Sequence, residues 1–167
     1  MRAIGIDPGT AITGWGVVEQ DFGEQDLRVV AYGVITTPAK TPFPQRLKTI
    51  YDDLTAIIAE YQPDTAAVEM LFFSRNTTTA LSVGHGRGVA MLALANADLP
   101  IAEYKPLEIK QAIVGYGGAD KQQVQRMVKL LLNLDEIPKP DDAADALAVA
   151  ICHLHSARWA AIGMNSE

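Results

Sequence analysis

The sequence predicts an α/β fold, in which a mixed β-sheet carries helices on its faces. Two observations support this prediction. Three strand-like segments follow one another near the N-terminus with short turns between them, and the rest of the chain alternates helical patterns with two short apolar strands. The chain has 167 residues, 49% of them hydrophobic, which suffices for one domain with its own core.

The first three strands are predicted from β-forming residues and turn signals. Residues 1–7 form an apolar strand that ends at a Pro-Gly turn, residues 8–10. Alternating apolar residues follow over 13–20, and after a polar turn at 21–26 a third strand covers 27–36. Consecutive strands joined by turns this short form an antiparallel meander.

The middle of the chain alternates helix, strand and helix. Residues 43–61 carry apolar side chains at helical spacing, and a Pro-Asp pair at 63–64 ends this helix. Residues 65–70 have the composition of a short buried strand. A second helix is expected over 77–97, where threonines provide capping residues at its start.

The C-terminal part continues the alternation. Residues 100–104 predict another short strand, so the sheet has five strands in all. Residues 106–114 and 119–134 predict two helices separated by a glycine-rich turn, and a last helix is expected over 141–157 after two prolines.

Composition excludes several classes of protein. The lone Cys152 rules out an internal disulfide and a multi-cysteine zinc site, which fits a reducing compartment. No opening stretch has the pattern of a signal peptide, and no apolar run is long enough to cross a bilayer. We expect one domain over residues 1–157, a flexible tail over residues 158–167, a cytoplasmic location and no membrane partner.

Charge is unevenly distributed along the chain. The net charge is −6, which on its own argues against a nucleic-acid-binding protein. Residues 73–132, however, contain seven basic and four acidic residues, whereas both flanking segments are acidic. A basic middle segment is compatible with phosphate contacts on one face, although charge fluctuations of this size are also common in proteins that bind no DNA.

Two acidic residues stand at the ends of apolar strands. Asp7 follows an apolar run and precedes the Pro-Gly turn, and Glu69 follows Ala66, Ala67 and Val68. The carboxyl ends of strands are where α/β sheets place their ligand sites. If the two strands are neighbours, the carboxylates repel each other, and a divalent cation would relieve that repulsion.

The last helix contributes further acids. Asp142 and Asp145 are three residues apart, so they project from roughly one face. Asp141 is a credible helix cap, and acids in a first helical turn also favour the helix dipole. Capping alone does not explain Asp145, which lies on the apolar side of an alanine-rich helix and needs a partner there.

Carboxylate oxygens are the ligands that Mg²⁺ prefers, and no histidine or cysteine cluster competes for a softer metal. Two such ions about 4 Å apart would flank a scissile phosphate, one activating water and the other stabilising the leaving 3′ oxygen. The acids therefore point to phosphodiester hydrolysis.

Several motifs, taken in order, resemble the RuvC family of crossover (Holliday) junction endodeoxyribonucleases. They are Gly5-Ile6-Asp7-Pro8-Gly9-Thr10 with Gly14-Trp15-Gly16, Ala67-Val68-Glu69-Met70-Leu71-Phe72-Phe73-Ser74-Arg75-Asn76, Gly86-Arg87-Gly88-Val89-Ala90, Val114-Gly115, Lys121, and Asp142-Ala143-Ala144-Asp145-Ala146-Leu147-Ala148. The likeness covers nearly the whole chain. Some relatives carry histidine at the position of Asp142.

The resemblance implies an RNase H-like fold with a mixed five-stranded sheet flanked by helices. It implies a nucleoid-associated homodimer that resolves four-way DNA junctions in recombination and repair by paired symmetric nicks, leaving 5′-phosphate ends. Two Mg²⁺ ions per site are expected, with Mn²⁺ as a substitute, and a branch-migration motor of RuvA and RuvB as partner. By motif position, the residues that would hold the metal ions and carry catalysis are Asp7, Glu69, Asp142 and Asp145.

The resemblance also implies residues that contact DNA. Phe72 would stack on an unpaired base, while its neighbour Phe73 packs in the core. Further contacts to the DNA backbone are expected from Arg75, Asn76, Lys110 and Lys121. Alternatively, Lys110 and Lys121 are ordinary solvated lysines on a helix face.

Three glycines interrupt the helix expected over 77–97. Gly84, Gly86 and Gly88 fit no phosphate-binding loop, and inside a helix they cost roughly 2–3 kcal/mol relative to alanine. A close helix–helix approach would offset this cost. In the family this helix forms the dimer interface, so we expect the three glycines there, with His85 at or near the same surface.

Two other functions are compatible with parts of the sequence. The turn at residues 7–10 is similar to the phosphate-binding turn of sugar kinases and actin-like ATPases, but those proteins need a second lobe and would leave Asp142 and Asp145 without a role. A DNA-junction binder without catalysis could use the same fold, but an incomplete acidic set would then be expected.

Overall fold

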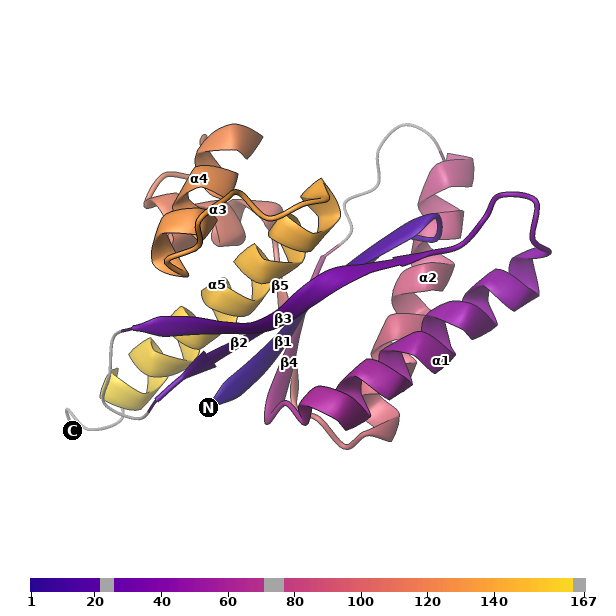
Figure 1. The fold of residues 1–167 in the computed structure, drawn as a ribbon, viewed down its shortest axis with the longest axis horizontal. Coiled ribbons are helices and arrows are strands. Elements are labelled where there is room, and N and C mark those ends of the chain that lie inside the picture. Colours follow the sequence, from indigo (N-terminus) through magenta and orange to yellow (C-terminus); the bar gives the residue numbers. More distant parts are fainter. Residues whose placement is uncertain (22–25, 71–76, 164–167) are drawn as a thin grey trace.

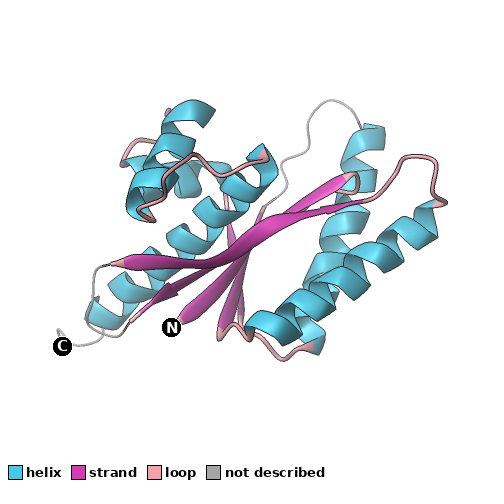
Figure 2. Ribbon diagram, viewed as in Figure 1, coloured by secondary structure: helices cyan, strands magenta, loops and turns pink. Residues whose placement is uncertain are grey.

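The computed structural model describes residues 1–21, 26–70 and 77–163, and contains one five-stranded sheet with helices on both faces (Figures 1 and 2). Phe72, Arg75 and Asn76, expected beside the DNA, and Phe73, expected in the core, lie outside the described residues. Among the residues described, no helix combines the length and the apolarity that a membrane crossing requires.

The sheet has the strand order β3-β2-β1-β4-β5. Its strands are β1 (Arg2–Asp7), β2 (Ile12–Gln20), β3 (Leu27–Thr36), β4 (Thr65–Glu69) and β5 (Ile101–Tyr104). The first three strands are antiparallel neighbours, which confirms the predicted meander, while β4 runs parallel to both β1 and β5. The predicted mixed sheet is thus confirmed.

The helices form two layers. They are α1 (Phe43–Tyr61), α2 (Thr77–Asn96), α3 (Pro106–Val114), α4 (Lys121–Leu131) and α5 (Asp141–Gly163). In Figure 1, α1 and α2 cover one side of the sheet, and α5 lies against the other, with α3 and α4 packed beside α5. Each side has its own buried hydrophobic cluster, so the sheet is apolar on both faces.

Side chains of β1 alternate between these clusters. Ala3 belongs to the cluster on the α5 side, whereas Ile4 and Ile6 belong to the cluster under α1 and α2. The same alternation turns Gly5 toward α5, where a Cβ atom would clash with the backbone carbonyl of Ala146. Glycine therefore lets α5 approach the sheet at backbone distance.

Several predicted helix ends differ from the structure: the helix expected over 77–97 ends at Asn96, and the helix expected over 119–134 ends at Leu131. The helix expected from residue 119 begins at Lys121, because the Asp120 carboxylate accepts a hydrogen bond from the Gln123 backbone N–H (2.8 Å) and caps it. The last helix, expected to end at residue 157, continues to Gly163. Residues 158–162 contain no glycine or proline, so nothing in their composition ends the helix earlier.

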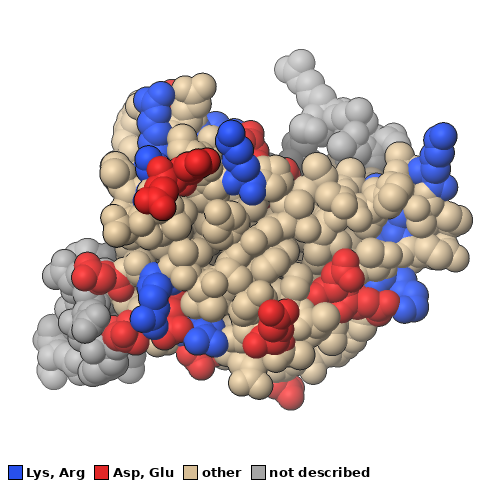
Figure 3. All heavy atoms as spheres, in the orientation of Figure 1, with Lys and Arg blue, Asp and Glu red and all other residues tan. Residues whose placement is uncertain are grey.

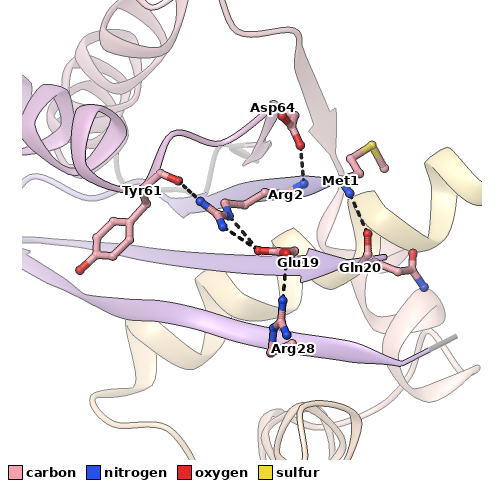
Figure 4. A network of polar contacts seen from close by, with 7 residues as sticks. All are labelled: Met1, Arg2, Glu19, Gln20, Arg28, Tyr61 and Asp64. Carbon is pink, nitrogen blue, oxygen red and sulfur yellow. Dashed lines mark hydrogen bonds and ion pairs between the residues drawn. The ribbon is translucent and has the colours of Figure 1, made fainter. Parts of the chain in front are cut away.

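A network of hydrogen bonds and ion pairs connects β1, β2 and β3 at the end of the sheet where β1 begins (Figure 4). Arg2 forms an ion pair with Glu19 (2.7 Å) on the neighbouring strand, and Arg28 of β3 pairs with the same carboxylate (2.9 Å). Arg2 also donates to the backbone carbonyl of Tyr61 at the end of α1 (2.5 Å). The network lies at the end of β1 opposite to Asp7.

Candidate active site

Asp7 and Glu69 lie side by side at the carboxyl ends of two parallel strands. Ile6 of β1 is paired with Val68 of β4, and each acid is the next residue of its strand. Because side chains alternate along a strand, Asp7 lies on the same face as Ala3, and Glu69 on the same face as Ala67. Both faces are the α5 side of the sheet.

The N-terminus of α5 reaches this point. Gly14 of β2 is paired with Asp7, and a Cβ atom on Gly14 would overlap the backbone carbonyl of Asp142. The first turn of α5 therefore sits directly on the sheet beside Asp7. Asp145 follows one turn later on the same helix.

Glu69, Asp142 and Asp145 lie close enough to Asp7 to influence its ionisation. Burial, and then the negative charges of Glu69, Asp145 and Asp142, together raise the pKa of Asp7 to about 8. Burial, and then the charge of Asp145, also raise the pKa of Glu69, which accepts a hydrogen bond from Asp7. A carboxyl that resists ionisation in this way is typical of functional sites, where a cation supplies the missing charge.

Lys121 supplies part of the positive charge that the acids require. Its Nζ lies 3.1 Å from Oδ2 of Asp145 and 3.2 Å from Oδ2 of Asp141. Burial raises the pKa of Asp145, while the hydrogen bond from Lys121 lowers it. Asp141, expected as a helix cap, is the first residue of α5, and its carboxylate pairs with this lysine.

A cavity of about 240 Å³ opens beside the acids, and both predicted lysines border it. Its polar lining is formed by Glu69, Asp145, Lys110 and Lys121. Its apolar wall is formed by Pro106, Ile109, Val124 and Ala148. A concave site lined by both carboxylates and ammonium groups suits an anionic group that is held together with a cation.

The donor set fits a hard divalent cation, because it consists of carboxylates without histidine or cysteine. Over the residues that the structure describes, however, no three ligand side chains are already gathered around one point at metal-binding distance. Asp145 instead faces Lys121. Holding a cation would therefore require side-chain rotation within the acidic group.

The three helix glycines do not share one environment. Gly84 and Gly88 are exposed, and no atom lies within 4 Å of the position that a Cβ atom would take. Gly86 is buried within the chain against Gly9 and Thr10, in the turn that follows Asp7. Only Gly84 and Gly88 are therefore open to a partner.

Sequence reasoning missed a hydrogen-bonded group behind the site. His153 of α5 shares hydrogen bonds with the hydroxyls of Thr65 (2.8 Å) and Tyr104 (2.9 Å), and burial lowers its pKa. Tyr104 is paired with Glu69 in the sheet, so the group lies next to the strand that carries Glu69. His155, as expected, points elsewhere, toward the carbonyl of Ala112 (3.4 Å).

Charge on the molecular surface is mixed. The face in Figure 3 carries acidic and basic side chains side by side, and basic side chains lie over the part of the molecule that contains α4. A DNA contact is therefore expected to be local rather than spread over the whole protein.

Comparison with known proteins identifies the family. The family model for crossover junction endodeoxyribonuclease RuvC matches residues 3–153. The RuvC protein of Chloroflexus aggregans is 62% identical over 157 residues, 94% of each chain, and that of Heliobacterium modesticaldum is 60% identical over 159 residues, 95% of this chain and 97% of the relative.

Solved structures agree. The Thermus thermophilus RuvC structure has a TM-score of 0.89 at 35% identity, covering 96% of this chain and 97% of that one. T. thermophilus RuvC in complex with Holliday junction substrate has a TM-score of 0.87 at 33% identity, covering 95% and 96%. The RNase H-like fold implied by the sequence motifs is thereby confirmed, and the chain belongs to the RuvC family of crossover junction endodeoxyribonucleases.

Proposed function

We propose that this protein is a structure-selective DNA endonuclease that resolves Holliday junctions by paired symmetric nicks, in recombination and repair at the nucleoid. The observation that carries the proposal is the convergence of four carboxylates at one end of the sheet, beside a cavity bordered by two lysines. Its RuvC relative from T. thermophilus has been solved with a Holliday junction substrate.

Asp7, Glu69, Asp142 and Asp145 are proposed to hold two Mg²⁺ ions, which Mn²⁺ can replace. Bound ions of this kind activate a water molecule and neutralise charge on the leaving 3′ oxygen, giving 5′-phosphate ends. The raised pKa of Asp7 supports this role, because burial and like charges both favour a cation at that point.

Lys110 and Lys121 are proposed to face the scissile phosphate. Both border the cavity that Glu69 and Asp145 line, so their ammonium groups can stabilise negative charge on a phosphate held there. Phe72, Arg75 and Asn76 are proposed to contact the DNA next to the site, since their segment follows directly on Glu69.

A homodimer is proposed to form through α2. An apolar groove of about 490 Å³ runs along this helix and α1, lined by Leu47, Ala80, Leu81, Gly84, His85, Gly88, Val89 and Leu92. Leu81 and Leu92 are 64% and 53% exposed. Because Gly84 and Gly88 have no atoms over them, the α2 helix of a second copy can approach closely there. RuvA and RuvB are the proposed motor partners.

The decisive experiment is cleavage of a synthetic four-way junction with Mg²⁺, using a linear duplex of the same sequence as control. Simultaneous nicks in two opposite strands, with 5′-phosphate ends, support the proposal. ATP hydrolysis without nicking would support the kinase-like alternative, and junction binding without nicking would support a non-catalytic junction binder.

A further inference from the structure

Asp141 lies outside the four converging acids, yet it shares a counterion with them. The Lys121 ammonium lies between two carboxylates of α5, 3.2 Å from Asp141 and 3.1 Å from Asp145. The two acids are four residues apart and therefore lie on the same side of the helix. Lys121 therefore forms ion pairs both with Asp145, an acid of the site, and with Asp141, an acid at the edge of the site.

The two carboxylates differ in their surroundings. The Asp145 side chain is 29% exposed, and its burial makes a cationic partner necessary. The Asp141 side chain is 63% exposed, and Lys121, followed by the Gln125 amide, lowers its pKa. The Gln125 Nε2 atom is buried and does not reach strict hydrogen-bonding geometry with any described residue, so we regard Lys121 as the principal partner of Asp141.

We propose that Asp141 is a positioning residue for Lys121, and this inference rests on the proposed function. A divalent cation and Lys121 compete for the same Asp145 carboxylate. By sharing the ammonium, Asp141 weakens the hold of Lys121 on Asp145 and so eases cation binding. When the cation takes Asp145, Asp141 keeps the ammonium at the edge of the cavity, because a flexible lysine without a partner would turn to solvent.

The first test measures Mg²⁺ binding to the DNA-free protein by calorimetry for the wild type, Asp141→Asn, Lys121→Gln and the double variant. We expect Asp141→Asn to weaken binding about two- to fivefold and Lys121→Gln to strengthen it by a similar factor, the scale of an exposed ion pair. In the Lys121→Gln background, Asp141→Asn should have no further effect, since Asp141 acts through Lys121.

A simple charge effect predicts a different result. If Asp141 only adds negative charge, its removal weakens Mg²⁺ binding equally in both backgrounds, and that additivity would overturn the proposal. Asp135→Asn removes an equal charge from the loop before α5 and should leave the affinity within experimental error of the wild type. Asp141→Glu, which can still reach Lys121, should restore wild-type affinity.

The second test uses single-turnover nicking of a four-way junction. We expect Asp141→Asn to lower the maximal rate while junction affinity and the melting temperature stay unchanged, and Asp141→Glu to recover the rate. A loss that appears only in junction affinity or in melting temperature would contradict the positioning role. If the wild type itself neither binds Mg²⁺ nor nicks junctions, the proposed function fails; if it does both and the cycle is additive, only the role of Asp141 fails.

Discussion

Gly14 faces the backbone of Asp142, and this contact sets the distance between the sheet and the acidic end of α5. A methyl group at Gly14 would overlap the Asp142 carbonyl. We expect Gly14→Ala to push the first turn of α5 away from Asp7, to lower the free energy of unfolding by about 1–3 kcal/mol, and to weaken Mg²⁺ binding. Chemical denaturation and calorimetry measure the two effects.

A control is Gly84→Ala, measured at a protein concentration at which the proposed dimer is dissociated, because within one chain the structure leaves open space at that position. There the substitution should stabilise the helix by up to about 1 kcal/mol. Equal stability losses in both variants would show that the contact between Gly14 and Asp142 is not the cause.

Asp7→Asn should abolish junction nicking while junction binding persists. Asparagine keeps the size of the side chain but removes the charge that a metal ion needs at the centre of the acidic group. The loss should be on the order of 10²–10³-fold or more. Nicking gels and a binding assay in the same buffer separate the two steps, and substantial cleavage by this variant would contradict the assignment of Asp7.

Asp7 should also make the metal-free protein less stable as pH rises. Its pKa is about 8 in the folded chain and 3.8 as the ordinary value, so the unfolded chain gives up the proton first. Stability is therefore present near pH 4 and is lost as pH rises toward 8. In a chelator, Asp7→Asn should melt several degrees above the wild type at pH 8, at roughly 2–4 °C per kcal/mol.

The difference between these two proteins should shrink as pH falls toward 4, where Asp7 is protonated in the folded chain and the ordinary pKa of 3.8 for the unfolded chain is approached. Parallel melting curves from pH 4 to pH 8 would refute the prediction. Added Mg²⁺ should raise the wild-type melting temperature more than that of the variant, because only the wild type retains the full acidic set.

His153 should have the opposite effect to Asp7 on the pH dependence of stability: it should make the protein less stable as the pH falls. Burial lowers its pKa from 6.5, so the unfolded chain takes up a proton first as pH falls, and stability is lost below about pH 6.5. His153→Gln should be less stable at pH 7.5, by about 1–3 kcal/mol for the lost hydrogen bonds, and less sensitive to acid. A His153→Gln variant with the same acid sensitivity as the wild type would contradict this role.

Gly88→Leu should weaken self-association and uncouple the two nicks. Leucine would fill the open space over α2 that the second copy is proposed to occupy. Analytical ultracentrifugation at low protein concentration tests the first effect, and the fraction of singly nicked junctions tests the second. Leu130→Gln removes an exposed leucine of α4 away from that groove and should change neither; an unchanged dimer with Gly88→Leu would reject the interface.

The sequence predicted the fold well where local patterns decide the structure. Helical spacing gave α1 its observed limits, Phe43–Tyr61, and the strand-end positions of Asp7 and Glu69 followed from their apolar runs. The pairing of β1 with β4 could only be assumed, because parallel register depends on contacts between segments far apart in the chain.

Tertiary contacts explain what sequence reasoning did not find. Nothing in a glycine pattern tells which glycine faces its own chain, and Gly86 packs against the turn after Asp7. The spacing of Asp141 and Asp145 could have indicated a shared partner, but the partner, Lys121, belongs to another helix. The link from His153 to Thr65 and Tyr104 likewise joins three separate elements.

Successive residues of strand β1 face opposite sides of the sheet, and the two sides belong to different parts of the proposed function. Positions 3, 5 and 7 face the side of the sheet that carries the acids. The side chains at 4 and 6 belong to the cluster under α1 and α2, the helices that border the proposed dimer groove. Inserting or deleting one residue in this strand would exchange the two sets. Catalysis and assembly would then be lost together, although no side chain of either site had been replaced.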